Sequence, residues 1–313
     1  MAAWKTLLTD GLEENGQTIL RASTEITDRN GISGEELLQV IGEYDALIVR
    51  GRTKVNAAVL AAGKKLKVVG RSGVGVDNID LAAARENKIT VVNAPLGLTI
   101  AVAELTLGLM LSMTREIPRA DSGMKNGKWL KKELEGTEIY GKTLGVVGVG
   151  RIGSAVAQRA EACGMKAIGY DALLQPDEIL QRGLEPVGLD ELYARADIIT
   201  VHTPLTPETR GMLGAAAFEK MKPGVRIVCA ARGGVIDEAS LLAALNSGKV
   251  AFAGLDVFAV EPPEASELAV HPHVICTPHI GAQTLEAQAR AAYDISTEVL
   301  AALRSEPLRW KVA

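Results

Sequence analysis

Three charged residues in the second half of the chain lie in segments that are otherwise apolar or rich in turn residues. They are Arg232, Glu261 and His279. An imidazole is the side chain best suited to exchange a proton near neutral pH, and a carboxylate beside it would orient the ring and keep it protonated. The planar guanidinium of Arg232 suits a carboxylate group. Together these residues predict proton transfer on a small molecule that carries a carboxylate.

Taken singly, each of the three residues also has a structural interpretation. The arginine could form a surface ion pair, the glutamate could be an exposed loop residue, and the histidine could have a purely structural role. Other histidines compete for the proton-transfer role. His202 ends an expected strand, whereas His271 and His273 flank a proline in an expected loop. The prediction of a site therefore depends on the joint presence of all three residue types.

A glycine pattern precedes these residues in the chain. Gly148, Gly150 and Gly153 follow the apolar run 144–147 and open a helical pattern that ends at Cys163. In a βαβ unit that binds a dinucleotide, the first glycine makes the tight turn and the second lets the backbone approach a pyrophosphate. The third lets helix and strand pack closely. The pyrophosphate would lie at the helix N-terminus, where unpaired N–H groups and the helix dipole favour an anion.

An acidic residue completes this unit. Asp171 lies about 20 residues beyond the glycines, at the end of the apolar run 167–170, where its carboxylate can accept hydrogen bonds from both hydroxyls of an adenosine ribose. A 2′-phosphate would face this carboxylate at close range, and residues 172–175 include no arginine to neutralise it. The sequence therefore predicts NAD, and not NADP, as the cofactor.

A second glycine cluster, residues 70–75, also follows an apolar run and competes for the dinucleotide. It leads into the turn sequence 77–80, and no acid closes a second strand at the expected distance. The successive N–H groups of this cluster predict a small anion-binding nest instead. A tight loop without any ligand is the alternative interpretation.

The composition indicates a globular protein of about two domains. The chain has 313 residues, of which 47% are hydrophobic and 23% charged, and its net charge is -4. Because it contains no run of Lys or Arg, we expect no nucleic-acid partner and no membrane partner. The cysteines, Cys163, Cys229 and Cys276, contain no Cys-x-x-Cys pair, which favours reduced thiols in a cytoplasmic protein and no metal site.

Apolar runs alternate with helical patterns along both halves of the chain, which predicts parallel sheets. In the first half the expected strands lie at 6–8, 46–49, 66–69 and 89–92, and Ser33 with Glu36 predicts a helix start. In the second half, strands are expected near Val146, Ile168, Ile199, Ile227, Gly254 and Ile275. Residues 100–140 predict an apolar helix followed by a protruding arm. The helix 285–303 is expected to return to the first domain.

The glycine pattern 148–153, taken with Arg232, Glu261 and His279, resembles the NAD-dependent D-isomer-specific 2-hydroxyacid dehydrogenase family. Further segments recur in that family in the same order, namely 71–78, 202–205, 231–234, 256–258 and 278–281. Within the family the chain is most similar to the branch that acts on D-3-phosphoglycerate, through residues 48–50, 70–80, 127–129 and 169–171. The resemblance covers nearly the whole chain.

The resemblance implies an enzyme that passes a hydride between nicotinamide C4 and substrate C2, converting D-3-phosphoglycerate to 3-phosphohydroxypyruvate in serine biosynthesis. His279 would exchange the hydroxyl proton, Glu261 would pair with it, and Arg232 would hold the carboxylate. The implied cofactor contacts are Gly148, Gly150, Arg151, Ile152, Gly153, Asp171, His202, Thr203, Pro204, Ala230, Arg232, Asp256, His279 and Gly281. The implied substrate contacts are Arg50, Arg71, Ser72, Gly73, Val74 and Gly75, with Lys131 from a neighbouring subunit.

The family also implies an α/β architecture in which a Rossmann doubly wound parallel-sheet cofactor domain is inserted into a smaller flavodoxin-like α/β substrate domain. The cofactor domain would comprise residues 99–284, and the substrate domain residues 1–98 and 285–313. The arm within 100–140 implies a homodimer. Because the chain ends at Ala313, without the regulatory domains of many relatives, we expect no feedback by serine.

Two other functions stay open at this point. A glyoxylate or hydroxypyruvate reductase of the same family would use the same three side chains, and an NAD-responsive corepressor-like binding protein would use the same fold. Cys229 and Leu98 stand where asparagine is common in the family, which leaves the identity of the 2-hydroxy acid open.

Overall fold

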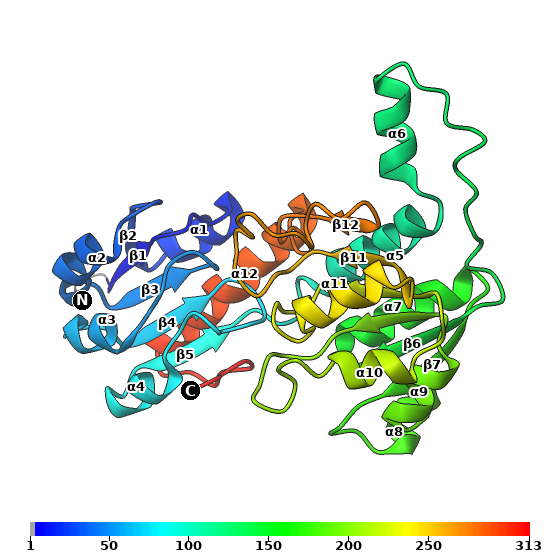
Figure 1. Cartoon of the computed structure of the whole chain (residues 1–313). Coiled ribbons are helices and arrows are strands. Elements are labelled where there is room, and N and C mark those ends of the chain that lie inside the picture. Colours follow the sequence, from blue (N-terminus) through cyan, green and yellow to red (C-terminus); the bar gives the residue numbers. More distant parts are fainter. Residues whose placement is uncertain (1–3) are drawn as a thin grey trace. The chain divides into compact units, whose positions relative to one another are not determined.

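The computed structural model describes residues 4–313 (Figure 1). The chain divides into two compact units, Met1–Leu98 with Gln283–Ala313, and Thr99–Ala282. We call them unit 1 and unit 2. Each unit is built on its own parallel sheet. The predicted α/β fold with two parallel sheets is therefore confirmed.

Unit 1 contains a five-stranded sheet in the order β2-β1-β3-β4-β5. Its strands are β1 (Trp4–Leu8), β2 (Thr24–Asp28), β3 (Ala46–Val49), β4 (Val68–Arg71) and β5 (Thr90–Asn93). From β1 the chain adds β2 on one side of the sheet, and it then adds β3, β4 and β5 in turn on the other side. The position between β1 and β3 is therefore the topological switch point of this sheet, where open α/β sheets bind ligands. The sequence did not predict β2, because charged residues interrupt its short apolar pattern.

Helices pack against this sheet in two groups. The first group is α1 (Glu14–Arg21) and α12 (Leu285–Leu303), which contact each other, and α12 also contacts β4 and β5. The second group is α2 (Gly34–Val40), the 3-10 helix η1 (Ile41–Glu43), α3 (Ala57–Ala62) and α4 (Leu81–Glu86). A Cβ on Gly70 would come within 2.6 Å of Val299 Cγ2, so the close approach of α12 to β4 requires glycine there. The final helix thus covers the first sheet, as the sequence predicted.

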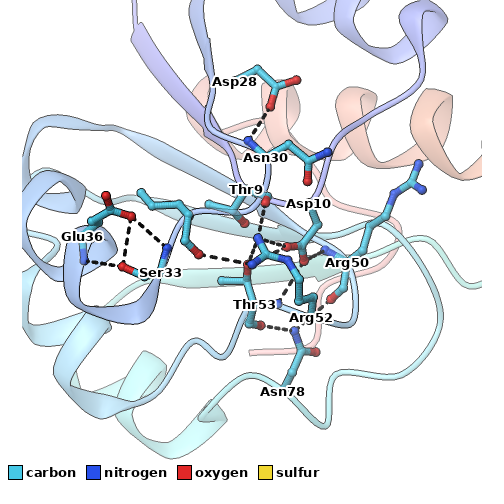
Figure 2. Close-up of polar contacts among 11 residues, drawn as sticks. Thr9, Asp10, Asp28, Asn30, Ser33, Glu36, Arg50, Arg52, Thr53 and Asn78 are labelled. Atoms are coloured by element: carbon cyan, nitrogen blue, oxygen red, sulfur yellow. Dashed lines mark hydrogen bonds and ion pairs between the residues drawn. The ribbon is translucent and has the colours of Figure 1, made fainter. Parts of the chain in front are cut away.

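The predicted start of α2 is also confirmed. Ser33 Oγ accepts a hydrogen bond from the Glu36 N–H, and the Glu36 carboxylate accepts one from the Ser33 N–H (Figure 2). This reciprocal pair satisfies two helix-end donors. The capping box could be predicted because both partners lie within one helical turn of each other.

Unit 2 contains a seven-stranded sheet in the order β12-β11-β10-β9-β6-β7-β8. Its strands are β6 (Thr143–Val147), β7 (Lys166–Tyr170), β8 (Glu185–Pro186), β9 (Ile198–Val201), β10 (Val225–Cys229), β11 (Val250–Leu255) and β12 (Val274–Cys276). Apart from the edge strand β12, this is the strand order of doubly wound dinucleotide-binding folds. Its switch point lies between β6 and β9.

The helices of unit 2 also form two groups. The apolar helix α5 (Thr99–Thr114) packs against α7 (Arg151–Ala162) and contacts β10, β11 and β12. A second group contains α9 (Leu189–Arg195), α10 (Ala215–Lys220) and α11 (Glu238–Asn246), while α8 (Pro176–Gln181) contacts β8. Within residues 4–313 we find no helix that combines the length and the apolar character needed to cross a bilayer.

The predicted arm is present in unit 2. Glu116 adopts a left-handed backbone with φ +48° between α5 and α6 (Ile117–Lys125), so the chain changes direction there. Figure 1 shows α6 extending away from the sheet of its own unit, followed by an irregular segment that returns to β6. The apolar side chains of Ile117, Met124 and Trp129 are 50%, 58% and 75% exposed.

The C-terminal residues pair with the edge of the unit 1 sheet, where Val91 exchanges backbone hydrogen bonds with residues 312 and 313. Glu298 of α12 is 2% exposed and fixes the turn that leads to this segment. Its carboxylate accepts from the N–H groups of Arg309 at 3.0 Å and Trp310 at 3.1 Å, and from Arg309 Nε at 3.4 Å. One buried charge therefore satisfies two backbone donors and a guanidinium.

We expect Glu298→Ala to lower the free energy of unfolding by about 2–4 kcal/mol, because two N–H groups lose their acceptor and the exposed Arg309 loses its carboxylate partner. Denaturant unfolding measures this change. Amide exchange at Val91 and Val312 should accelerate in the same variant. Glu306→Ala removes an exposed acid nearby in the sequence and should change stability by less than about 0.5 kcal/mol. Equal effects of the two variants would contradict this account of Glu298.

Candidate active site

The three predicted catalytic side chains follow three neighbouring strands of unit 2. Arg232 follows β10, Glu261 follows β11 and His279 follows β12. These strands are adjacent and parallel in the sheet, so the segments that leave their carboxyl ends meet at one edge. The sheet therefore brings together residues that are distant in the sequence.

Glu261 and His279 form a hydrogen-bonded pair at this edge. His279 Nδ1 lies 2.8 Å from Glu261 Oε2, and the Phe258 N–H donates to Glu261 Oε1 at 3.1 Å. Burial raises the pKa of Glu261, but the bonds from His279 and Phe258, together with the charge of Arg232, outweigh burial and lower it. The carboxylate is thus ionised at neutral pH. The pairing of Nδ1 leaves Nε2 as the ring nitrogen that can face a substrate.

Asp256, 1% exposed, holds the loop that carries His279. Its Oδ1 accepts from Thr277 Oγ1 at 2.6 Å and from the Ile280 N–H at 2.8 Å, and its Oδ2 accepts from the Gly281 N–H at 2.8 Å. The His279 N–H bonds to the Asp256 carbonyl at 2.9 Å. His279 has a φ of +53°, which is uncommon for a residue other than glycine. The cofactor contact that we expected of Asp256 stays a prediction, and in the structure this residue positions the histidine.

The loop that carries Arg232 packs against the loop that leads to Glu261. A Cβ on Gly233 would lie 1.8 Å from the Phe258 carbonyl oxygen, so no other residue fits at this contact. Arg232 Nη1 donates to the Ala231 carbonyl at 2.6 Å. The buried Cys229 places its Sγ 3.8 Å from the Arg232 carbonyl, and burial raises the pKa of this thiol. Cys229 is therefore a neutral contact beneath the arginine loop.

A cavity of about 450 Å³ opens beside the histidine and glutamate, a volume typical of small-molecule sites. It is lined by Asp256, Phe258, Glu261, Pro262, Pro263, Cys276, Thr277, Pro278 and His279.

The glycine turn after β6 has the geometry that the sequence predicted. Gly148 has a φ of +92°, and a Cβ there would lie 2.8 Å from the His202 carbonyl carbon. A Cβ on Gly153 would lie 2.1 Å from the Gly148 oxygen, whereas one on Gly150 would meet no atom within 4 Å. Packing thus requires the first and third glycines, and the second faces open space at the N-terminus of α7. This cradle fits a pyrophosphate.

Asp171 lies beside this turn at the end of β7. Its Oδ2 accepts from the Val149 N–H at 2.9 Å and its Oδ1 from the Leu173 N–H at 2.9 Å. Each oxygen retains further acceptor capacity for a ribose hydroxyl. Arg182 Nη1 donates to the Val149 carbonyl at 2.6 Å. Arg182 was not predicted to lie at this turn, because it falls outside residues 172–175 and no local sequence pattern connects it with the turn.

His202 directly follows β9 and lies next to the glycine turn. Its Nε2 lies 2.9 Å from Thr200 Oγ1, and its buried Nδ1 finds no hydrogen-bond partner within residues 4–313. Burial lowers the pKa of His202 to about 4, so the ring is neutral at physiological pH and is not a general acid there. The other expected cofactor contacts lie around the same edge, with Arg151 and Ile152 in α7, Thr203 and Pro204 after β9, and Ala230 after β10.

The remaining two histidines interact with each other. The His273 N–H donates to His271 Nδ1 at 3.1 Å, and the His273 ring packs on Phe252 with centroids 4.7 Å apart. These contacts give both residues a structural role, which removes them as competitors of His279.

The second glycine cluster lies in unit 1, after β4. The N–H groups of Ser72 and Gly73 donate to the carbonyls of Val49 and Arg71, so two of the expected nest donors are already used within the loop. The anion-binding nest that we expected in this loop stays a prediction, with fewer N–H donors than its successive residues suggested. Ser72 is 5% exposed and its Oγ is buried without a hydrogen-bond partner in the described chain. That hydroxyl and the N–H groups of residues 74 and 75 are the donors that this loop can offer.

Arg50 lies at the end of β3, the strand that neighbours β4, and therefore beside Arg71. Its main-chain N–H donates to Asp10 Oδ2 at 2.7 Å, and its guanidinium pairs with Glu13. Lys131 is exposed in the irregular segment after α6 of unit 2, where its predicted role in a neighbouring subunit stays a prediction. Within residues 4–313, no group of three or more His, Cys, Asp or Glu side chains is arranged to hold a metal ion.

The lowered pKa of His202 predicts a pH-dependent stability. The unfolded histidine titrates near its ordinary value and the folded one at about 4, so the unfolded state binds more protons between these values. Stability is therefore complete above about pH 6.5 and is lost on acidification, by about 2 kcal/mol between pH 7 and pH 5.

Denaturant unfolding of the wild type and of His202→Gln over this pH range measures the difference, and the variant should show the flatter profile. His273→Gln makes the same substitution at an exposed histidine and should retain most of the acid-dependent loss of stability seen in the wild type. Parallel profiles for all three proteins would contradict the neutral, buried state of His202.

Comparisons with known proteins agree with this geometry. Residues 107–281 match the model of the D-isomer specific 2-hydroxyacid dehydrogenase, NAD binding domain. The D-3-phosphoglycerate dehydrogenases of Rattus norvegicus and Methanocaldococcus jannaschii are 44% and 48% identical to this chain over 97% and 96% of its length. The chain spans only 57% and 58% of the length of these two relatives.

Solved structures give the same result. A glyoxylate reductase from Paecilomyes thermophila superimposes with a TM-score of 0.91 at 31% identity, covering 100% of this chain and 99% of that one. The apo-structure of D-lactate dehydrogenase from Escherichia coli superimposes with a TM-score of 0.85 at 28% identity, covering 99% and 100%. The family resemblance expected from the sequence is confirmed, and the chain belongs to the D-isomer specific 2-hydroxyacid dehydrogenases.

Proposed function

We propose that this protein interconverts a D-2-hydroxy acid and the corresponding 2-keto acid with NAD, and that its substrate pair is D-3-phosphoglycerate and 3-phosphohydroxypyruvate. The observation that carries the reaction class is the hydrogen-bonded pair of Glu261 and His279, which lies at the carboxyl edge of the same sheet as the glycine cradle. The relatives named as D-3-phosphoglycerate dehydrogenases support the choice of substrate.

NAD, when bound, supplies the hydride acceptor at nicotinamide C4. We assign its pyrophosphate to the cradle of Gly148, Gly150 and Gly153 and its adenosine ribose to Asp171. The neutral His202 would lie beside the bound NAD. The fit rests on the open space at Gly150 and on the unpartnered Nδ1 of His202. The His202 ring is neutral because a charged imidazole would be costly to bury at this position.

The protein's own groups supply proton transfer and orientation. In the oxidation direction, the C2 hydroxyl of the substrate gives its proton to His279 Nε2 while its C2 hydrogen leaves as a hydride. Glu261 stabilises the imidazolium that forms and fixes the ring through Nδ1. Arg232 binds the substrate carboxylate and polarises the C2 oxygen. In the reverse direction, His279 returns the proton to that oxygen.

We assign the anionic groups of the substrate to the loops after β3 and β4 of unit 1. Arg50 and Arg71 would bind the phosphate, and the buried hydroxyl of Ser72 would donate to the carboxylate together with the N–H groups of Val74 and Gly75. Two guanidinium groups at neighbouring strand ends offer the forked geometry that phosphate oxygens accept. Lys131 of a second subunit would add a further phosphate contact.

Absorbance of NADH over a panel of substrates tests the proposal. We expect turnover of 3-phosphohydroxypyruvate with NADH and of D-3-phosphoglycerate with NAD. His279→Ala should lower kcat by about a hundredfold or more while NADH binding, measured by fluorescence, persists. His273→Ala is the matched control and should retain activity.

Turnover of glyoxylate or hydroxypyruvate without turnover of the phosphorylated substrates would replace our substrate with that of a glyoxylate or hydroxypyruvate reductase. Full activity in His279→Ala would contradict the assignment of the proton donor. Binding of NADH with no turnover of any 2-hydroxy or 2-keto acid would favour a binding protein.

We also propose that the protein is a homodimer that assembles through the arm. The exposed apolar side chains of Ile117, Met124 and Trp129 on and after α6 support this assignment, because apolar clusters on an extended element favour a protein partner. A cytoplasmic location suits Cys163, Cys229 and Cys276, which are free thiols.

Sedimentation of the wild type should give the mass of a dimer, and the double variant Ile117→Asp with Met124→Asp should give that of a monomer, because charges at the interface centre oppose association. Leu180→Asp introduces a charge at a side chain of α8 that is 62% exposed and should leave the dimer intact. A monomeric wild type, or a double variant that remains dimeric, would contradict the role of the arm.

A further inference from the structure

A pair of opposite charges lies at the topological switch point of unit 1. Glu13 follows β1 and Arg50 follows β3, and these two strands are neighbours in the sheet. Open α/β sheets bind ligands at the carboxyl ends of the strands that flank such a point. The pair therefore stands at the position in this sheet where an anionic ligand is expected.

The main chain of Arg50 is fixed without any help from Glu13. Its N–H donates to Asp10, whose side chain is 4% exposed, and its carbonyl accepts from Asn78 Nδ2 at 2.9 Å. Arg52 and Thr53 complete this cluster through Asp10, and Figure 2 shows the guanidinium of Arg50 pointing away from it. Arg52 thus has a structural role, whereas the guanidinium of Arg50 is presented outside the cluster.

Glu13 binds the guanidinium of Arg50. Both of its carboxylate oxygens lie 2.5 Å from Arg50 Nη2, and the two side chains are only 31% and 23% exposed. Glu13 occupies the N-cap position of α1 but makes no side-chain bond to that helix. Its carboxylate therefore binds Arg50 and does not cap the N-terminus of α1.

The other donors of Arg50 are not used by Glu13. Arg50 Nε is buried and has no hydrogen-bond partner in the described part of the chain. The guanidinium of Arg71 reaches the same loop, since its Nη2 lies 4.0 Å from the position of a Cβ on Gly51. An anion bound here would share Arg50 with Glu13, and its charge would face the Glu13 carboxylate across one guanidinium.

We propose that Glu13 is a specificity-determining residue, the resident counter-ion of Arg50, which weakens the binding of phosphorylated substrates. The inference rests on the proposed function, in which Arg50 receives the substrate phosphate. Repulsion between a dianion and a half-buried carboxylate raises KM for the phosphorylated substrate and favours release of the phosphorylated product. Substrates that lack a phosphate do not place a charge at Arg50, so Glu13 leaves their KM unchanged.

Glu13→Gln tests this inference, because glutamine keeps an oxygen that can accept from Arg50 and removes only the charge. We expect KM for 3-phosphohydroxypyruvate to fall about three- to tenfold and KM for glyoxylate to stay unchanged. Inorganic phosphate should raise the melting temperature of the variant at lower concentrations than it does for the wild type. Glu14→Gln removes the neighbouring charge, which pairs with Arg21, and should behave as the wild type.

Arg50→Ala separates the inference from the proposed function. If Arg50→Ala selectively raises KM for the phosphorylated substrate and Glu13→Gln leaves that KM unchanged or raises it, the role of Glu13 is overturned and the phosphate site stands. If the wild type turns over no phosphorylated substrate, the proposed substrate fails, and the response to inorganic phosphate alone then decides the role of Glu13: an unchanged response overturns it.

Discussion

The carboxylate of Asp256 is the interaction on which the candidate active site depends. It is almost completely buried, and it binds one side chain and two backbone N–H groups of the loop after β12. These bonds, with the backbone bond from the His279 N–H, hold the histidine in a left-handed conformation that few residues other than glycine adopt. The imidazole reaches Glu261 from this conformation. Removing the carboxylate of Asp256 would therefore release the loop that places the His279 ring beside Glu261.

The same physical rule governs both sheets. Parallel strands present their carboxyl ends at one edge, and the edge opens at the point where the strand order reverses. In unit 2 this point holds the glycine cradle and the neutral His202, which suit a pyrophosphate because they supply N–H groups without requiring a buried cation. In unit 1 it holds Arg50, whose guanidinium suits an anionic group but is already paired with the Glu13 carboxylate.

The glycine cradle of unit 2 and the proposed phosphate site of unit 1 therefore offer an anion different kinds of group. The cofactor cradle uses backbone dipoles that do not change with pH or with the motion of a side chain. The proposed phosphate site in unit 1 would instead rely on guanidinium groups, and one of these, Arg50, already has a carboxylate partner. Such a partner lowers the free-energy cost of a half-buried guanidinium when no ligand is bound. The same carboxylate would also lower the affinity of the guanidinium for an anionic ligand.

The sequence alone determined the features that adjacent residues encode. The glycine turn, the capping box at Ser33 and the apolar runs of most strands are all local, because turn chemistry and hydrophobic periodicity depend on near neighbours. The sequence also supplied the residue types of the proposed catalytic trio, but not their meeting. The short strand β2 escaped detection because its charges hide that periodicity. Only the tertiary structure decided which distant groups meet. The bonds of Asp256 to the histidine loop, of Arg182 to the glycine turn and of Glu13 to Arg50 depend on strand order and loop paths, which no local pattern specifies.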